Sequence, residues 1–342
     1  MALKVTELSS IVPEGEAWAG EIRRRMTGIA KSIGLSEEKC SNVGLVATEM
    51  ATNLAQHRAA SPMIRYGITL SEQGEKGLLI LSEDRGPGIA DLDRALQDHF
   101  STSGTLGGGL GAIRRLSDDF AIYSEPVRPG VAFPGTVVIS RTWSRLPTSE
   151  PFDCEALTRP KPGETDNGDG VSYAPGDGRL QVAVIDGLGH GLGASKAAKA
   201  AREKLKGSGT LPLADLLDQL HIELQKTQGA VIGLLRLDLR EGRATYAGIG
   251  NIDCRIYGRQ PARPISVNGS LGVVPPRCRE ESFSFGKGDL FILASDGLST
   301  KWEPSHYLKR TDPSPLLLGA LLLRDQLRAN DDATVVIGRI GS

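Results

Sequence analysis

Cysteine is scarce and scattered in this chain of 342 residues. The four cysteines, at positions 40, 154, 254 and 278, form no CxxC pair. This spacing argues against a disulfide framework and against a thiolate zinc site, and it favours a reducing cytoplasm.

The chain also lacks long apolar runs and an excess of one charge. No apolar run approaches the roughly 20 residues that cross a bilayer, and residues 1–13 lack the basic-then-apolar layout of a signal peptide. Lys and Arg total 40 against 41 Asp and Glu, a formal net charge of -1. We therefore expect a cytoplasmic protein that binds neither nucleic acid nor a membrane.

The length of the chain suits two domains of ordinary size. Its composition, 39% hydrophobic and 24% charged, is typical of a soluble globular protein. A polar, proline-bearing segment at residues 145–151 marks the expected boundary. We predict domains at residues 1–142 and 150–342, with a linker at residues 143–149.

Apolar periodicity predicts a mixture of helices and strands in both halves. In the first half, the pattern predicts helices at 36–57 and 112–116 and strands at 64–70, 78–81, 121–123 and 136–140. In the second half, it predicts helices at 194–205 and 213–227 and strands at 180–185, 231–238, 244–249, 290–294 and 334–340. Strand-rich stretches separated by helical blocks indicate layered α+β domains rather than a strict βαβ alternation.

The predicted helix at 36–57 carries a carboxylate and an amide on one side. Glu49 and Asn53 are four residues apart, so they point in the same direction. The amide oxygen would complete the oxygen shell of Mg²⁺, and the carboxylate would orient or deprotonate an attacking hydroxyl. A solvated helix face is the alternative reading of this pair.

An acidic turn follows the predicted strand at 78–81. Asp84 is followed by Gly86 and Gly88, which let the backbone bend sharply. An aspartate in this position can accept a hydrogen bond from an exocyclic amino group such as that of adenine. Alone, such a motif is often only a turn.

A glycine-rich loop opens the predicted helix at 112–116. Gly107, Gly109 and Gly111 permit close approach of the backbone, and a helix N-terminus attracts phosphate. The loop lacks the Lys-Ser/Thr pair of a Walker A motif and the later acid of a dinucleotide fold.

Taken in order and together with Gly135-Thr136, these motifs resemble the boxes of the histidine-kinase-like ATPase superfamily. Residues 83–120 resemble the RsbT-type switch kinases of bacterial stress signalling, and the resemblance spans nearly all of residues 1–140. It implies an α/β sandwich that binds Mg-ATP, with Asp84 on adenine, Asn53 on Mg²⁺, Glu49 as base, and the glycines and Thr136 around the nucleotide. It also implies phosphorylation of serine or threonine on a STAS-domain antagonist or scaffold protein.

In the second half, aspartates fall at predicted loop positions beside glycines or strand ends. Asp169, Asp186 and Asp296 each precede a glycine, and Asp331-Asp332 precedes a predicted strand. Such carboxylates can converge at one end of a sheet sandwich, where an all-oxygen cluster selects Mg²⁺ or Mn²⁺ rather than zinc. Two such ions would activate a bridging water. A single Asp-Gly of this kind is usually a turn.

The order of these acids resembles the SpoIIE/RsbX-type branch of the metal-dependent type 2C protein phosphatases, over about residues 150–342. The resemblance implies an α-β-β-α metallophosphatase sandwich that hydrolyses phosphoserine or phosphothreonine. It implies metal ligands at Asp169, Asp186, the carbonyl of Gly187, Asp296 and Asp331, with Asp332 beside them. Arg159 and Lys161 are candidates for phosphate contact. His190 is expected to stabilise its loop, with contact to phosphate as the alternative.

The two resemblances together predict a bifunctional bacterial partner-switching regulator of the α+β class. One half would phosphorylate a STAS-domain protein with ATP, and the other would remove phosphate through a two-metal site. An alternative remains: an ATP-dependent, anti-sigma-like module that holds a sigma factor or another regulatory protein, or a nucleotide sensor, fused to an active phosphatase.

Overall fold

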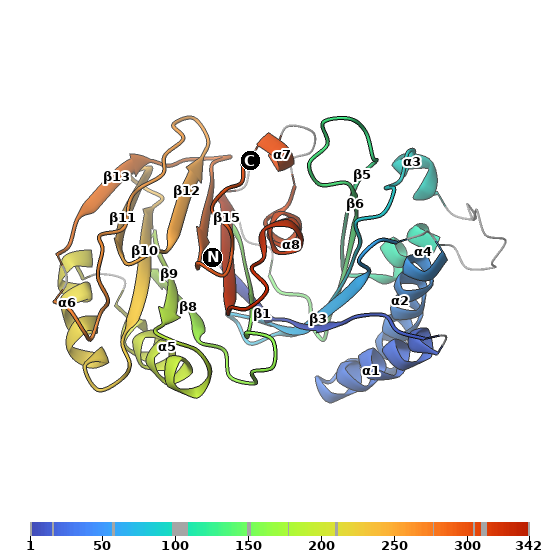
Figure 1. The fold of residues 1–342 in the computed structure, drawn as a ribbon, viewed down its shortest axis with the longest axis horizontal. Coiled ribbons are helices and arrows are strands. Elements are labelled where there is room, and N and C mark those ends of the chain that lie inside the picture. Colours follow the sequence, from blue (N-terminus) through green and yellow to red (C-terminus); the bar gives the residue numbers. More distant parts are fainter. Residues whose placement is uncertain are drawn as a thin grey trace. The chain divides into compact units, whose positions relative to one another are not determined.

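The computed structural model describes residues 2–15, 17–56, 59–97, 109–148, 152–176, 178–208, 211–275, 277–303, 305–308 and 313–340. The chain divides into two compact units (Figure 1). The N-terminal unit comprises Thr6–Thr148 and His306–Asp325, and the C-terminal unit comprises Met1–Val5, Ser149–Ser305 and Gln326–Ser342. Among the described residues, no helix has both the length and the apolarity needed to span a membrane.

The N-terminal unit contains an antiparallel sheet in the order β3-β4-β6-β5, with the short β2 paired to β3. Helices α1, α2 and α4 cover one face of this sheet (Figure 1). Its elements are β2 (Ser9–Ile11), α1 (Trp18–Ser32), α2 (Glu37–Gln56), β3 (Met63–Ser71), β4 (Lys76–Glu83), α3 (Leu92–Ala95), α4 (Gly109–Leu116), β5 (Asp119–Glu125), β6 (Gly135–Trp143), α7 (Ser305–Leu308) and α8 (Pro315–Gln326).

Helix α2 forms where the sequence predicts it, because its apolar residues recur at helical spacing. Val43, Val46, Met50 and Leu54 are buried in the core between the helices and the sheet. Ile113 of α4 joins the same core. The apolar stripe therefore fixes which side of α2 faces the sheet.

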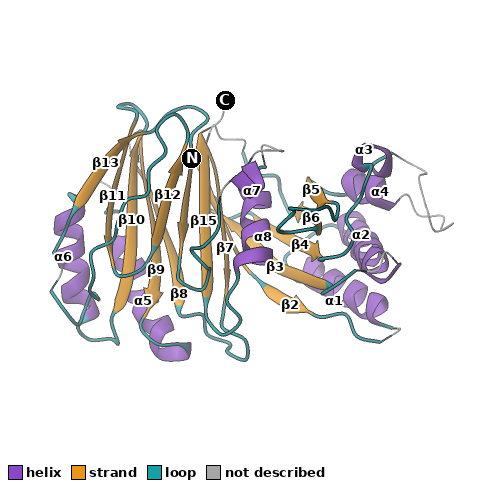
Figure 2. Ribbon diagram, turned by 45° about the horizontal axis from the view of Figure 1, so that its top comes forward, coloured by secondary structure: helices purple, strands orange, loops and turns teal. Residues whose placement is uncertain are grey.

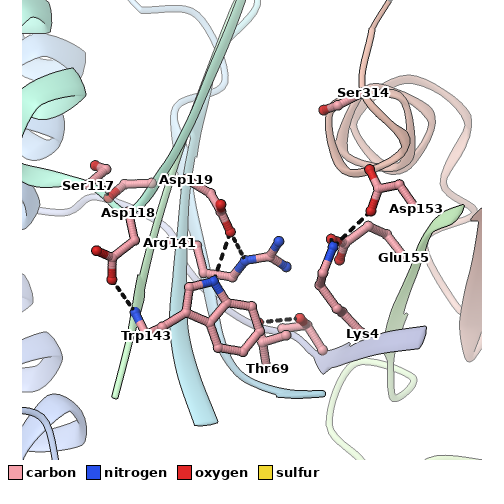
Figure 3. A network of polar contacts seen from close by, with 12 residues as sticks. Lys4, Thr69, Ser117, Asp118, Asp119, Arg141, Trp143, Asp153, Glu155 and Ser314 are labelled. Carbon is pink, nitrogen blue, oxygen red and sulfur yellow. Dashed lines mark hydrogen bonds and ion pairs between the residues drawn. The ribbon is translucent and has the colours of Figure 1, made fainter. Parts of the chain in front are cut away.

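The division into units differs from a single break near residue 147. Residues 1–5 group with the C-terminal unit, whereas residues 306–325 group with the N-terminal unit. In the latter segment, Tyr307 stacks on Phe133 at a ring-centroid distance of 6.0 Å. Lys4, in the former segment, donates hydrogen bonds to Asp153 at 2.8 Å and to Glu155 at 3.0 Å (Figure 3).

The C-terminal unit contains two sheets. One has the order β12-β14-β15-β7, with the start of β1 beside β7, and the other has the order β13-β11-β10-β9-β8. The elements are β1 (Ala2–Glu7), β7 (Phe152–Arg159), β8 (Asp169–Gly176), β9 (Arg179–Gly187), α5 (Gly191–Leu205), α6 (Leu213–Leu224), β10 (Ala230–Asp238), β11 (Arg243–Ile249), β12 (Asp253–Tyr257), β13 (Glu280–Ser284), β14 (Leu290–Ala294) and β15 (Ala333–Ile340).

The two sheets stack face to face, and helices cover the outer face of the second one. Phe291 and Val336 from one sheet share a buried core with Val184 and Leu235 from the other. Helices α5 and α6 lie on the opposite face of the second sheet (Figure 2), where they bury a further apolar core. The predicted α+β class, with two layered domains, is confirmed.

Two details differ from the sequence-based prediction. Asp169 was expected in a loop, but it is the first residue of β8, directly opposite Asp186 in the pairing with β9. The helix predicted at 213–227 ends at Leu224, because Thr227 turns back and its hydroxyl donates to the Leu224 carbonyl at 2.8 Å. That early end brings residues 225–229 into the turn before β10.

Candidate functional site

The C-terminal unit gathers its predicted acids at one end of the two sheets. Asp169 begins β8 and Asp186 lies near the end of β9, and their Cα atoms are partners in the antiparallel register. Asp296 lies two residues beyond the end of β14, and Asp331 and Asp332 immediately precede β15. Four separate stretches of the sequence therefore supply one acidic cluster.

These carboxylates lie near enough to one another that each affects the charge of the others. Burial raises the pKa of Asp169 and of Asp186, and the charges of nearby carboxylates raise both further. For Asp186, these charges are those of Asp169, Asp296, Asp331 and Asp332. Burial and the charge of Asp331 likewise raise the pKa of Asp296. Such a cluster favours a bound cation, because a positive charge relieves repulsion that protons otherwise relieve.

Hydrogen bonds hold individual acids in place. The Ser295 hydroxyl donates to Oδ2 of Asp169 at 2.6 Å and accepts from the Thr334 backbone N–H at 2.9 Å. The Asn251 side-chain amide donates to Oδ2 of Asp296 at 2.8 Å. Each bond leaves other lone pairs of its carboxylate available to a cation.

The Asp296–Gly297 turn packs tightly against the strand-leading acids. A Cβ atom at Gly297 would lie 1.9 Å from the carbonyl oxygen of Asp332, so no larger residue fits there without movement. The Lys161 backbone N–H donates to Oδ1 of Asp332 at 2.8 Å, which also draws the loop before β8 to this acid. Close backbone approach thus explains the glycine after Asp296.

The donor set fits a hydrated Mg²⁺ site. Among the described residues, no three or more His, Cys, Asp or Glu side chains already surround a point that could hold a metal ion. Mg²⁺ nevertheless keeps several waters and commonly uses only one or two carboxylates. Pairs such as Asp169 and Asp186, with the carbonyl of Gly187 nearby, could hold such an ion.

In the N-terminal unit, the structure brings the acidic turn and the strand β6 together. The Asp84 backbone N–H donates to the Thr136 carbonyl at 3.0 Å, and Oδ1 of Asp84 accepts from the Gly86 N–H at 2.7 Å. Ser124 links both segments, since its hydroxyl bonds to Ile89 N–H at 2.8 Å and to Thr136 Oγ1 at 2.9 Å. The predicted Asp84, Gly86 and Thr136 therefore form one local arrangement.

Gly135 is required by this arrangement. Its φ is +114°, and a Cβ atom there would lie 2.2 Å from the carbonyl oxygen of Asp84. Gly88 is similarly confined, with φ of +70° and a Cβ position 2.4 Å from the carbonyl oxygen of Glu125. Only glycine allows these backbones to approach so closely.

The remaining predicted residues of this half lie in the helical layer. Glu49 and Asn53 are both half-buried on α2, and burial raises the pKa of Glu49. Gly109 and Gly111 lie in α4, which packs with α2 in one core. Gly107 lies outside the described residues, so its position relative to Glu49 stays a prediction.

Sequence reasoning missed two supporting residues of the acidic cluster. Asn251 follows β11 just as Asp296 follows β14, so a polar residue after an apolar strand was the available signal. Ser295 directly precedes Asp296, but nothing in the sequence indicates that it reaches Asp169 on another strand. Such pairings depend on the tertiary fold.

The basic side chains near the cluster have different surroundings. Nη2 of Arg159 donates to the carbonyls of Arg328 at 2.9 Å and of Asp331 at 3.3 Å, so this guanidinium supports the backbone. Nδ1 of His190 lies 3.0 Å from Oε1 of Glu164, which agrees with the loop-stabilising role expected for it.

Two family models match the chain. The model described as histidine kinase-like ATPase domain matches residues 13–139, and the model described as Stage II sporulation protein E (SpoIIE) matches residues 176–340. The first contains Glu49, Asn53 and Asp84, and the second contains Asp186 and the later acids.

Two curated relatives come from Bacillus subtilis (strain 168). The serine/threonine-protein kinase RsbT is 35% identical over 118 residues, which cover 34% of this chain and 82% of the relative. The phosphoserine phosphatase RsbX is 24% identical over 182 residues, which cover 53% of this chain and 90% of the relative. The predicted resemblance to a fusion of these two types is confirmed.

Solved structures agree with the fold. A structure described as "The bacterial stressosome: a modular system that has been adapted to control secondary messenger signaling" matches with a TM-score of 0.53 and 31% identity, covering 56% of this chain and 100% of its own. A crystal structure of RsbX in complex with magnesium matches with a TM-score of 0.52 and 21% identity, covering 58% and 99% respectively, which shows the fold alone. The chain therefore belongs, through its N-terminal part, to the RsbT family within the histidine kinase-like ATPases, and its C-terminal part is similar to the SpoIIE family and to RsbX.

Proposed function

We propose that this chain is a cytoplasmic partner-switching regulator with two opposed activities. Residues 1–142 would transfer phosphate from ATP to a serine or threonine of a STAS-domain protein. Residues 150–342 would remove phosphate from phosphoserine or phosphothreonine, with residues 143–149 as the linker. The likeness to RsbT and RsbX supports this pairing.

The convergence of aspartates from four stretches of sequence carries the phosphatase half of the proposal. Asp169, Asp186, the carbonyl of Gly187, Asp296 and Asp331 would hold two Mg²⁺ or Mn²⁺ ions. Bound there, the ions would supply an activated water and neutralise the phosphate oxygens. The role of the protein is to keep these oxygens oriented, which the bonds from Ser295 and Asn251 support.

The kinase half rests on the arrangement around Asp84 and on α2. Asp84 would accept a hydrogen bond from the adenine amino group, and the oxygen of Asn53 would bind Mg²⁺. Glu49 would take the proton from the attacking hydroxyl, and its raised pKa suits a carboxylate that accepts a proton. Gly107, Gly109 and Gly111 would close over the phosphates, with the remaining nucleotide contacts made by Gly86, Gly88 and Thr136.

Two opposed activities on one substrate would waste ATP if they ran together. We therefore propose that partner binding or a conformational signal favours one activity at a time. Equal rates of both reactions, measured with the partner present and absent, would overturn this part of the proposal.

The test is the intact mass of a candidate STAS-domain partner. The partner is incubated with the full chain and Mg-ATP, then freed of ATP and given Mn²⁺ or Mg²⁺. A gain of one phosphate that is lost in the second step supports the proposal. Matched controls are Asn53→Ala, which should abolish the gain, and Asp296→Asn, which should abolish only the loss.

A second outcome would favour the alternative function. Stable ATP-dependent binding of the partner or of a sigma factor, with no phosphate gained, would indicate a sequestering module or a nucleotide sensor. Loss of phosphate from a separately prepared phosphoprotein would then still identify an active phosphatase.

A further inference from the structure

The acidic cluster poses an electrostatic difficulty for a phosphate-bearing substrate. Five carboxylates share one end of the C-terminal unit: Asp169, Asp186, Asp296, Asp331 and Asp332. Two divalent cations would bring four positive charges against these five negative ones. A phosphate monoester adds roughly 1.5 to 2 further negative charges. A cationic side chain at the rim would therefore favour substrate binding.

Arg159, a candidate by its position in the sequence, does not meet this need. It is buried, and its Nη2 atom donates to the carbonyls of Arg328 and Asp331. These bonds fix the backbone on which Arg328 is mounted. The Arg328 backbone N–H, in turn, donates to the carbonyl of Gly297 at 2.8 Å.

The backbone of Arg328 is thus held from both sides, directly beside the Asp296–Gly297 turn and three residues before Asp331. Its side chain is exposed. Because its backbone N–H binds the carbonyl of Gly297, the residue after Asp296, this exposed side chain starts beside the acidic cluster. The guanidinium of an arginine at this position can extend into the solvent from which a substrate approaches the acidic cluster.

We infer that Arg328 is a substrate-binding residue whose guanidinium receives the phosphate group of a phosphoserine or phosphothreonine ester. This inference rests on the proposed phosphatase function and adds a residue that the acidic motifs do not include. Arginine suits the task because its planar donors pair with two phosphate oxygens at once. Lys161 is the rival, since it lies on the loop that donates to Asp332.

The test measures, by calorimetry, the binding of inorganic phosphate to the full chain in saturating Mg²⁺. The proteins compared are the wild type, Arg328→Ala, Arg328→Lys and Lys161→Ala. Loss of a charge-assisted contact should weaken phosphate binding about 10- to 100-fold in Arg328→Ala, and less in Arg328→Lys. Arg243→Ala is the matched control. This exposed arginine is the first residue of β11 and lies opposite Asp238 in the strand register. Asp238 is at one end of β10, whereas Val231, the register partner of Asp186, is near the other end.

A second readout separates substrate binding from general damage. Removal of a positive charge beside Asp296 should leave Mg²⁺ binding unchanged or tighter, whereas a disrupted site would bind both Mg²⁺ and phosphate more weakly. Unchanged phosphate affinity in Arg328→Ala, a larger effect of Lys161→Ala, or no phosphate binding by the wild type would overturn the inference.

Turnover of p-nitrophenyl phosphate distinguishes this inference from the proposed function. A wild type that binds phosphate through Arg328 but shows no Mg²⁺- or Mn²⁺-dependent hydrolysis would contradict the phosphatase proposal alone. A wild type that hydrolyses the ester with the same KM as Arg328→Ala would contradict the inference alone.

Discussion

Asp169 and Asp186 are direct cross-strand neighbours in the antiparallel pair of β8 and β9. Like charges in directly opposite positions destabilise a sheet, and here both groups are also largely removed from water. This end of the sheet is therefore less stable than its hydrogen bonds alone would make it, unless a cation is present. Three expectations follow from that relationship.

The first concerns Asp186→Asn. Without divalent cations at about pH 9, where both carboxyls begin to carry charge, the free energy of unfolding of this variant should exceed that of the wild type by about 1 kcal/mol, because one of two facing charges is removed. Added Mg²⁺ should raise the melting temperature of the wild type but raise that of the variant far less. Thermal unfolding with EDTA and with Mg²⁺ checks both.

The matched control for that experiment is Asp218→Asn, an exposed aspartate on α6. It should leave the response to Mg²⁺ unchanged. A variant at position 186 that is less stable without metal and still responds fully to Mg²⁺ would contradict the expectation.

The second expectation concerns pH in the absence of metal. Burial, opposed in part by the hydrogen bond from Ser295, raises the pKa of Asp169 to about 7, and burial together with neighbouring carboxylates raises that of Asp186 to about 9. Since the folded-state values exceed the ordinary 3.8, the folded protein binds more protons than the unfolded chain. Stability should therefore fall as pH rises from about 5 to 9, by at least about 1 kcal/mol.

Urea unfolding in EDTA at several pH values in that range measures this fall. Asp186→Asn should flatten the profile, and saturating Mg²⁺ should do the same in the wild type. A metal-free wild type whose stability rises with pH over this range would refute the account.

The third expectation concerns Ser295→Ala. The variant loses the bond to Asp169 and leaves the buried Thr334 N–H without its serine acceptor, which should lower the free energy of unfolding by about 1–3 kcal/mol. Affinity for Mg²⁺ should also fall, because Asp169 is no longer held. Ser282→Ala is the control, since Ser282 pairs with Thr245 in an exposed position. Equal losses in both variants would argue against a special role of Ser295.

A fourth prediction concerns the proposed nucleotide site around Asp84 and compares two glycines, one between β5 and β6 and one at the start of β6. Gly130 and Gly135 both have positive φ, at +82° and +114°, but only Gly135 is crowded by the Asp84 carbonyl. Gly130→Ala should lower the free energy of unfolding by about 1–2 kcal/mol, because a non-glycine residue adopts a positive φ unfavourably. Gly135→Ala should cost more and should also weaken binding of an ATP analogue, because it displaces Asp84.

Binding of a fluorescent ATP analogue and urea unfolding measure the two effects of each substitution. Nucleotide affinity that falls equally in both variants would show that the Gly135–Asp84 contact has no specific role.

The sequence predicted the elements whose local pattern is regular. The helix at 36–57 has a clear apolar period and a capping residue in Ser36, whose hydroxyl accepts from the Lys39 N–H at 3.2 Å, and it is observed at Glu37–Gln56. The strand at 290–294 is observed with the same bounds. Helix α8 was not predicted, because its continuous run of leucines has no period that separates a helix from a buried strand. Helix α1 buries only Ile22, Met26 and Ala30, too narrow a stripe to stand out.

The sequence predicted those site residues that lie at the ends of apolar strands. Asp186 and Asp296 were placed by the apolar strands before them, and the observed cluster includes both. The order of motifs could not reveal that β8 begins at Asp169 or that Asn251 reaches Asp296, since both depend on how distant strands pair. Side-chain hydrogen bonds across the fold leave no mark on the local sequence.

The position of Lys4 has a consequence for the order in which the chain assembles. Lys4 pairs with Asp153 and Glu155, which lie 149 and 151 residues further along the chain, and the Glu155 side chain is only 2% exposed. During translation, the start of β1 must therefore wait until the ribosome has released more than a hundred further residues. Substitution of Lys4 is accordingly expected to impair maturation of the unit that holds the acidic cluster, and to do so before it affects the helices that follow Lys4 in the chain.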